Sequence, residues 1–125
     1  LTCGWPAGDM IVIAARPAVG QTAFALHLAR TAASAGYHIA VYSLEMQGER
    51  LGDRWLLAAT TGVNPDHLLS GQLTPSELRQ IHEASTELSH LPIHIDDNPS
   101  VSLDYVRSSA NLLPRHGNCE GVIID

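Results

Sequence analysis

The sequence contains no lysine, and all seven of its basic residues are arginine. Thirteen acidic residues outweigh them, which gives a formal net charge of −6 at pH 7. Proteins bind a nucleic-acid backbone largely through clustered cations that displace counterions. Because the arginines form no such cluster, we do not expect this stretch alone to hold a nucleic acid. Any DNA contact would require residues or subunits outside it.

Cysteines and long hydrophobic runs are also scarce. The two cysteines, Cys3 and Cys119, are far apart and form no C-x-x-C pair, so the sequence indicates neither a disulfide framework nor a zinc knuckle. No apolar run approaches the roughly 20 residues of a membrane-spanning helix. The first residues also lack the basic start and apolar core of a secretory signal. We therefore expect a cytoplasmic protein with two unpaired thiols.

The chain does have enough apolar residues for a folded core. Of its 125 residues, 45% are hydrophobic and 16% are charged, a balance typical of one globular domain. The sequence begins in a loop-like segment and stops at Asp125, directly after an apolar run. We therefore expect residues 1–125 to be a single domain that is truncated after its last strand.

Short apolar runs alternate with helical patterns. Strands are predicted at 10–15, 38–45, 91–96 and 121–125, and helices at 22–35, at 48–61 with a stop at 62–65, after Thr74, and from Ser102 to Pro114. The clearest helix start is Thr74, Pro75 and Glu77, which have the spacing of a capping box. Strands that alternate with helices predict parallel pairing through crossovers. The expected fold class is α/β, an open, mostly parallel sheet with helices on both faces.

The segment AARPAVGQT, residues 14–22, is similar to the phosphate-binding pattern G-x-x-x-x-G-K-[ST]. Ala15 stands in place of the first glycine, Gly20 and Thr22 fit, and Gln21 occupies the lysine position. A strand before this loop and a helix after it provide the usual context, in which backbone amides and the helix N-terminus hold phosphates. The alternative is a plain turn between a strand and a helix that happens to contain Gly20.

Two acids follow predicted strands at what should be the same edge of the sheet. Glu45 ends the run SLE, and Asp125 ends VIID. Ligands of open α/β sheets bind at the carboxyl ends of the strands. In nucleotide hydrolysis by such an architecture, one carboxylate orients or deprotonates the attacking water and another holds Mg²⁺. Each acid alone is equally explained by a helix cap or a solvated turn, so the prediction depends on their combination with the loop.

Together, AARPAVGQT, SLEM, GQLT, IDD and VIID resemble the C-terminal motor domain of the DnaB-type replicative DNA helicases, a RecA-like P-loop NTPase, over nearly the whole chain. Alanine at the position of Ala15 is usual in that family. The resemblance implies that ATP and Mg²⁺ are bound, with Glu45 as catalytic base and with Thr22 and Asp125 as metal ligands. The phosphate loop that it implies consists of Arg16, Pro17, Ala18, Val19, Gly20, Gln21 and Thr22.

The resemblance also implies a ring hexamer that couples ATP hydrolysis to movement on single-stranded DNA. In the family, the arginine finger and the DNA-binding loops lie beyond the position of Asp125. Gln21 is the main departure, because its amide donates hydrogen bonds but carries no charge. Hydrogen bonds to charged groups contribute about 1.5–3 kcal/mol, so we expect weakened nucleotide binding and hydrolysis slowed by roughly ten- to a hundredfold or more.

Three other functions remain open at this stage. The first is a degenerate nucleotide-binding or regulatory module that has lost hydrolysis, and the second is another RecA-like ATPase. The third, a non-nucleotide α/β enzyme, would require the loop, Glu45 and Asp125 to coincide by chance.

Several further residues attract attention. The seven histidines show no ligand spacing that favours a transition-metal site. Asp96 and Asp97 either cap the turn before Asn98, the preferred interpretation, or lie near Mg²⁺. Trp5 is expected to pack against the sheet rather than stack on a base, and Trp55 is expected in the core.

Overall fold

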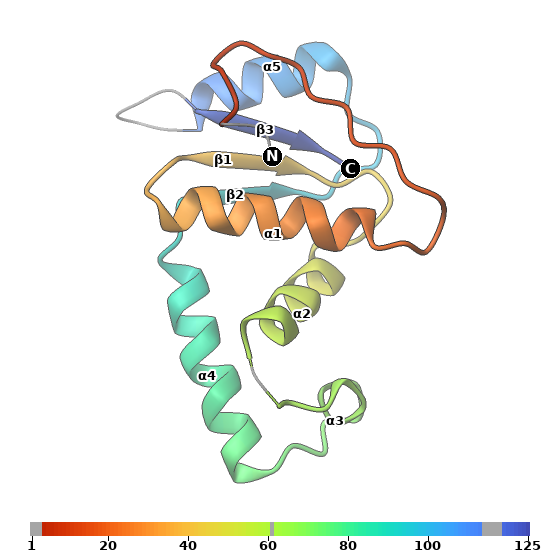
Figure 1. The fold of residues 1–125 in the computed structure, drawn as a ribbon, viewed down its shortest axis with the longest axis vertical. Coiled ribbons are helices and arrows are strands. Elements are labelled where there is room, and N and C mark those ends of the chain that lie inside the picture. Colours follow the sequence, from red (N-terminus) through yellow and green to blue (C-terminus); the bar gives the residue numbers. More distant parts are fainter. Residues whose placement is uncertain (1–3, 61, 114–118) are drawn as a thin grey trace.

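The computed structural model describes residues 4–60, 62–113 and 119–125. Its elements run in the order α1 (Gln21–Ser34), β1 (Ile39–Tyr42), α2 (Gly48–Ala59), α3 (Pro65–Ser70), α4 (Pro75–Ser89), β2 (Ile93–Asp96), α5 (Leu103–Leu112) and β3 (Gly121–Ile124) (Figure 1). Within the described residues, no helix is both long enough and apolar enough to cross a membrane.

The sheet has three strands in the order β2-β1-β3, and β1 is parallel to both of its neighbours. All four residues of β1 are buried. Its side chains alternate between the two faces: Ile39 and Val41 pack with α1 and α2, whereas Ala40 and Tyr42 pack with Val106 of α5. The predicted parallel sheet with helices on both faces is therefore present.

One core lies between the sheet and the helices α1 and α2. Its buried residues are Leu26, Ala29, Ala33, Ile39, Val41, Leu51 and Trp55. Small alanines on α1 let that helix approach the strands closely. Trp55 is 7% exposed, and its indole Nε1 donates a hydrogen bond to the Leu26 carbonyl oxygen at 3.2 Å. The prediction that Trp55 belongs to the core is confirmed.

Helix ends follow the capping signals of the sequence. The capping box of α4 is complete, because Thr74 accepts from the Glu77 amide while the Glu77 carboxylate accepts from the Thr74 amide. Ser102 caps α5 by accepting from the Tyr105 amide at 3.1 Å. Both predicted helix starts are confirmed. The predicted end of the last helix, at Pro114 and Gly117, lies outside the described residues.

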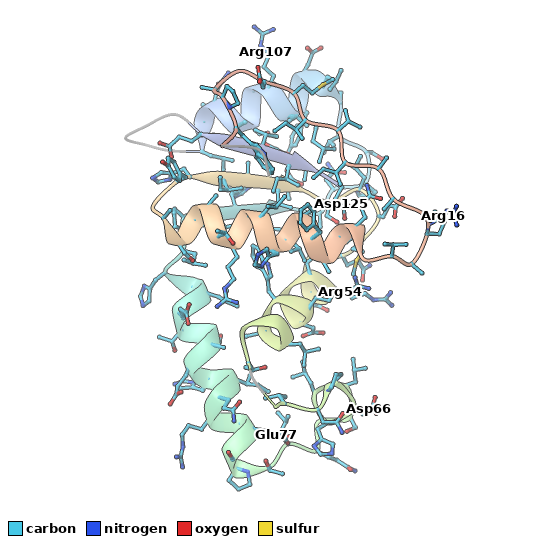
Figure 2. All side chains as sticks on the ribbon, viewed as in Figure 1. Arg16, Arg54, Asp66, Glu77, Arg107 and Asp125 are labelled. Atoms are coloured by element: carbon cyan, nitrogen blue, oxygen red, sulfur yellow. The ribbon has the colours of Figure 1, made fainter. Side chains whose placement is uncertain are left out.

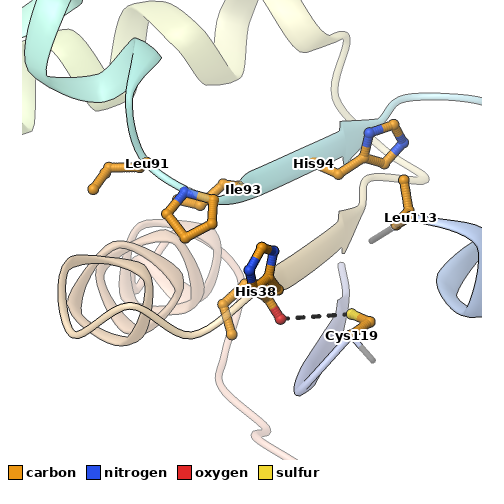
Figure 3. Close-up of a pocket in the computed structure, with 8 residues that line it drawn as sticks. His38, Leu91, Ile93, His94, Leu113 and Cys119 are labelled. Carbon is orange, nitrogen blue, oxygen red and sulfur yellow. Dashed lines mark hydrogen bonds between the residues drawn. The ribbon is translucent and has the colours of Figure 1, made fainter. Parts of the chain in front are cut away.

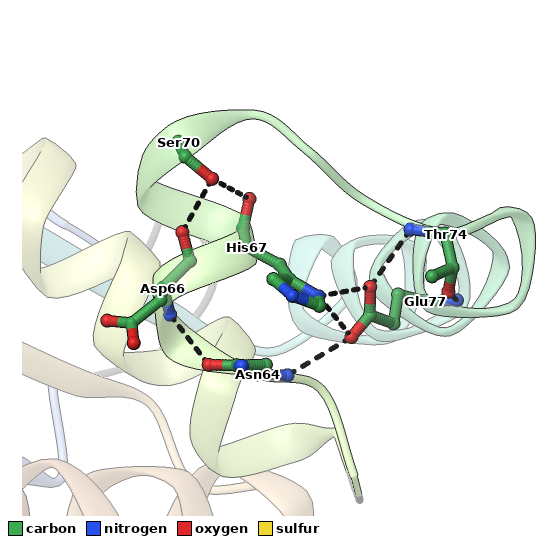
Figure 4. A network of polar contacts seen from close by, with 6 residues as sticks. All are labelled: Asn64, Asp66, His67, Ser70, Thr74 and Glu77. Carbon is green, nitrogen blue, oxygen red and sulfur yellow. Dashed lines mark hydrogen bonds and ion pairs between the residues drawn. The ribbon is translucent and has the colours of Figure 1, made fainter.

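The hairpin of α3 and α4 extends away from the sheet together with α2 (Figure 1). The carboxylate of Glu77 joins its parts: it lies 3.0 Å from Nδ1 of His67 and accepts from the backbone amides of Asn64 and Thr74 (Figure 4). Hydrogen bonding from the Thr74 amide and from His67 lowers the pKa of Glu77 from 4.5 to about 2. A carboxylate thus ties the loop before α3 to the start of α4.

The prediction of a first strand at residues 10–15 was wrong. This segment is irregular, and its side chains are exposed: Met10 by 88%, Ile11 by 45% and Val12 by 77%. An isolated strand is unstable because its backbone groups need a neighbour. Among the described residues, β1, β2 and β3 pair only with one another, so residues 10–15 have no strand beside them.

Two smaller predictions also needed correction. The second strand is shorter than expected and ends at Tyr42, so Glu45 lies in the loop before α2 rather than at a strand end. Asn64 and Pro65 were expected only to stop a helix, but they start α3, in which the Asn64 side chain accepts from the Asp66 amide at 2.9 Å. Turn residues that end one helix can serve equally well as the cap and first residue of the next.

Candidate functional site

The loop before α1 is curled by two residues in left-handed conformations. Ala18 has φ 65° and Gly20 has φ 102°, and a hydrogen bond of 3.3 Å from the Val19 amide to the Arg16 carbonyl closes a turn. Alternation of this kind turns successive N–H groups toward one side, as in anion-binding nests. Gly20 is also the N-cap of α1 and provides no side-chain cap, so the first amides of the helix stay available to a ligand.

Thr22 and Asp125 meet at the start of α1, although they are 103 positions apart in the sequence. The Thr22 hydroxyl Oγ1 donates to Oδ2 of Asp125 at 2.9 Å. Figure 2 places Asp125 near the beginning of α1, while Arg16 stands at the outer tip of the loop and points away. A hydroxyl and a carboxylate oxygen are the hard ligands that Mg²⁺ prefers. The two residues therefore fit the metal that the sequence pattern implies.

Glu45 lies on the same edge of the sheet, in the loop between β1 and α2. The Leu44 amide donates to the Asp125 carbonyl oxygen at 2.7 Å, and the Met46 amide donates to the Ser43 hydroxyl at 3.2 Å. Glu45 itself is exposed, and within the described residues its carboxylate makes no hydrogen bond or ion pair. Its backbone is thus held beside Asp125 while its side chain is left free to reach a ligand.

The side chain of Gln21 is engaged with the chain's own backbone. Its amide Nε2 donates to the carbonyl oxygen of Ile13 at 3.0 Å, across the base of the phosphate loop. An uncharged amide in this position closes the loop but offers no positive charge to a phosphate. The residue at the lysine position thus ties the loop to the segment before it.

Asp96 and Asp97 cap different elements. Asp96 accepts from the Asn98 amide at 3.0 Å and from the Tyr105 hydroxyl at 2.8 Å, and this hydrogen bond to the carboxylate raises the pKa of Tyr105. Asp97 accepts from the Gly48 amide at 2.8 Å. The turn-capping interpretation holds for Asp96, whereas the contact from Asp97 to α2 was not anticipated. The sequence did contain a signal for it, because residue 47, before the predicted helix, is a glutamine and cannot serve as a good cap.

Other residues considered in the sequence analysis lie apart from this site. Trp5 is 48% exposed, so it is not buried against the sheet as expected. A cavity of about 200 Å³ lies at the opposite ends of β1 and β2, where His38, Ile93, His94 and Cys119 are among its lining residues (Figure 3). Among the described residues, no three His, Cys, Asp or Glu side chains gather as metal ligands there or elsewhere. The chemistry of the site is therefore confined to the edge that carries the loop.

The sequence model of the DnaB-like helicase C terminal domain matches residues 1–125. The chain belongs to this family. It is 36% identical over 126 residues to the replicative DNA helicase DnaB of Geobacillus stearothermophilus, covering 100% of this chain and 28% of that protein. It is 38% identical over 126 residues to DnaB of a Nostoc species, covering 99% of this chain and 14% of that protein.

Two solved structures of DnaB-like helicase proteins have the same fold. The first, an ATPase domain, superposes with a TM-score of 0.77 at 25% identity and covers 87% of this chain and 39% of that one. The second, a DnaB-like replicative helicase studied for its interactions with primase, gives the same TM-score and identity and covers 87% and 26%. The predicted RecA-like fold class is confirmed. The chain spans 28% or less of the two DnaB proteins compared, so the activity of a whole DnaB-like helicase remains a proposal for it.

Proposed function

We propose that the chain is the ATP-binding part of the motor domain of a replicative DNA helicase, in which ATP hydrolysis drives movement along single-stranded DNA. The observation that carries this proposal is the contact of 2.9 Å between Thr22 and Asp125 beside the phosphate loop. Membership of the DnaB-like family supports it. In this proposal residues 1–125 belong to one motor domain, the protein acts in the cytoplasm as a ring hexamer, and DNA is bound by elements outside these residues.

Each residue of the site receives a role. The amides of residues 16–22 and the start of α1 hold the phosphates of ATP, and Thr22 and Asp125 hold Mg²⁺. The metal, when bound, offsets negative charge on the phosphates. Glu45 orients and deprotonates the attacking water, which its exposed and unpaired carboxylate is free to do.

Gln21 limits this motor. In the proposal, a cation at this position would face the β- and γ-phosphates, but the glutamine amide carries no charge and is held by the Ile13 carbonyl. The loop amides, Thr22 and Asp125 still contribute to binding. We therefore expect nucleotide affinity to fall modestly and hydrolysis to fall by roughly ten- to a hundredfold or more relative to a lysine-containing loop.

A binding and turnover experiment on the full-length protein tests both statements. A fluorescent ATP analogue is titrated with Mg²⁺ into the wild type and into Gln21→Lys, and ATPase rates are measured in parallel. Binding by both proteins, with a faster rate in Gln21→Lys, is the expected result. Gln72→Lys, which adds the same charge at an exposed position after α3, should leave both quantities unchanged. Failure of both proteins to bind the analogue would contradict the proposal.

A second function is favoured by one observation. Because the Gln21 amide is already bonded to Ile13, the chain also fits a nucleotide-binding or regulatory module that binds without hydrolysing. The same titration separates the two functions. Analogue binding with no turnover in either protein, even with lysine restored, would favour the regulatory module.

A further inference from the structure

The loop that carries Glu45 is anchored at both of its ends. At the end near β1, the Leu44 amide donates to the carbonyl oxygen of Asp125 at 2.7 Å. At the other end, the amide of Gly48, the first residue of α2, donates to Oδ2 of Asp97 at 2.8 Å. Residues 45–47 are the only ones between these two anchors. The position of Glu45 therefore depends on where α2 begins.

Asp97 is the only side chain that caps α2 in this structure, counting the described residues. The N-cap residue of the helix, Gln47, makes no side-chain hydrogen bond to it. Asp97 supplies the missing acceptor from a different part of the chain, directly after β2 and 49 positions away from Gly48. A carboxylate at a helix N-terminus also interacts favourably with the helix dipole.

Gly48 leaves little space for this contact to shift. A Cβ atom added at Gly48 would lie 3.3 Å from Oδ2 of Asp97 and 3.6 Å from its Cγ. The absence of a side chain at position 48 thus lets the carboxylate sit directly over the first amide of α2. The contact couples the end of β2 to the loop of Glu45 through one hydrogen bond.

We propose that Asp97 is a positioning residue for Glu45: by holding the first amide of α2, it fixes the loop that presents the Glu45 carboxylate to the attacking water. This inference rests on the proposed function, in which Glu45 acts on that water. It gives Asp97 no contact with nucleotide or metal. Removal of the cap should therefore lower turnover without lowering nucleotide affinity.

The test uses the full-length protein carrying Gln21→Lys as the parent, so that turnover is measurable. Asp97→Ala removes the acceptor, and we expect kcat to fall about tenfold with KM and analogue affinity nearly unchanged, because an N-cap acceptor contributes on this scale. Asp97→Asn keeps an oxygen acceptor and should recover most of the rate. Hydrogen exchange of residues 44–50 should quicken in Asp97→Ala and stay close to the parent in Asp97→Asn.

Two further variants separate positioning from general stability. Ser102→Ala removes the N-cap of α5, a loss of the same chemical kind at a helix that does not carry Glu45, and should leave kcat unchanged. Gly48→Ala replaces glycine with the better helix former but crowds Asp97, so we expect a lower kcat without lower thermal stability. A purely structural role for Asp97 would give the opposite pattern, with rates that follow stability in every variant.

The outcomes distinguish this inference from the proposed function. A parent that binds no ATP analogue overturns the proposed function, and that result comes from the titration before any Asp97 variant is compared. A parent that binds and hydrolyses ATP, with Asp97→Ala equal to it in kcat and in the exchange of residues 44–50, overturns the inference alone. Equal losses of kcat in Ser102→Ala and Asp97→Ala would also overturn it.

Discussion

At the scale of single residues, the site depends on backbone conformations that few side chains tolerate. Gly20 has φ 102° and is the N-cap of α1, directly before the residue that replaces the lysine. Ala18 adopts a left-handed conformation in the same loop even though it has a Cβ atom. The curvature that gathers the loop amides therefore depends on these two positions, and the glycine has the larger positive φ.

Gly20→Ala should destabilise the protein and weaken nucleotide binding. A residue with a Cβ atom in a left-handed conformation costs about 1–2 kcal/mol, although nothing lies within 4 Å of the position that the added atom would take. The matched control is Gly52→Ala, at a helical position of α2 with no positive φ and equally open space, where alanine should stabilise by about 0.5–1 kcal/mol. Chemical denaturation measures both changes, and equal effects at the two glycines would contradict the strain argument.

At the scale of elements, the hairpin of α3 and α4 is held by one carboxylate. Glu77 accepts from the Thr74 amide and from His67, and these contacts lower its pKa to about 2. Its charged form is thus bound more strongly in the folded state than in the unfolded chain, where the ordinary value of 4.5 applies. The associated stability is fully present above that ordinary value and is lost as the pH falls toward the lowered one.

Acidification from about pH 5 to about pH 3 should therefore loosen this hairpin before the sheet. Hydrogen exchange of residues 62–80, followed across that range, should quicken in the wild type. Glu77→Gln should be less stable above that range and show a flatter pH dependence. Glu83→Gln, an exposed position on the same helix, should behave as the wild type does. A wild-type hairpin whose exchange is independent of pH over this range would show that Glu77 does not hold it.

At the scale of the whole molecule, the sequence was most informative where the signals were local. The capping box at Thr74, the cap at Ser102 and the open parallel sheet were all predicted, because each follows from a few neighbouring residues or from the alternation of elements. The pairing of Thr22 with Asp125 was also anticipated, since ends of parallel strands share one edge. Membership of the DnaB-like family was predicted from the same motifs.

What could not be predicted depends on distant neighbours. Residues 10–15 have the composition of a buried strand, but a strand forms only beside another, and the sequence of the segment does not specify its partner. The contact from Asp97 to Gly48 joins positions 49 apart, and only the missing cap at Gln47 hinted at it. The hydrogen bond that ties Gln21 to Ile13 likewise depends on the path of the loop.

Hydrogen exchange of the 125-residue chain should reflect this arrangement. Amides of β1, which pairs on both sides and is buried along its length, should exchange most slowly. Amides of residues 10–15, which have no strand beside them among the described residues, should exchange fastest among the apolar segments. Protection of residues 10–15 comparable to that of β1 would contradict the structure and restore the strand that the sequence predicted.

The two aspartates at the end of β2 grip opposite layers of the molecule. Asp96 holds Tyr105 of α5 on one side of the sheet, and Asp97 holds the start of α2 on the other. One peptide unit thus links the two sides mechanically. A displacement of α2 in response to a nucleotide would pull on this link and be passed to α5, so events at the phosphate loop would be felt on the remote surface of the molecule.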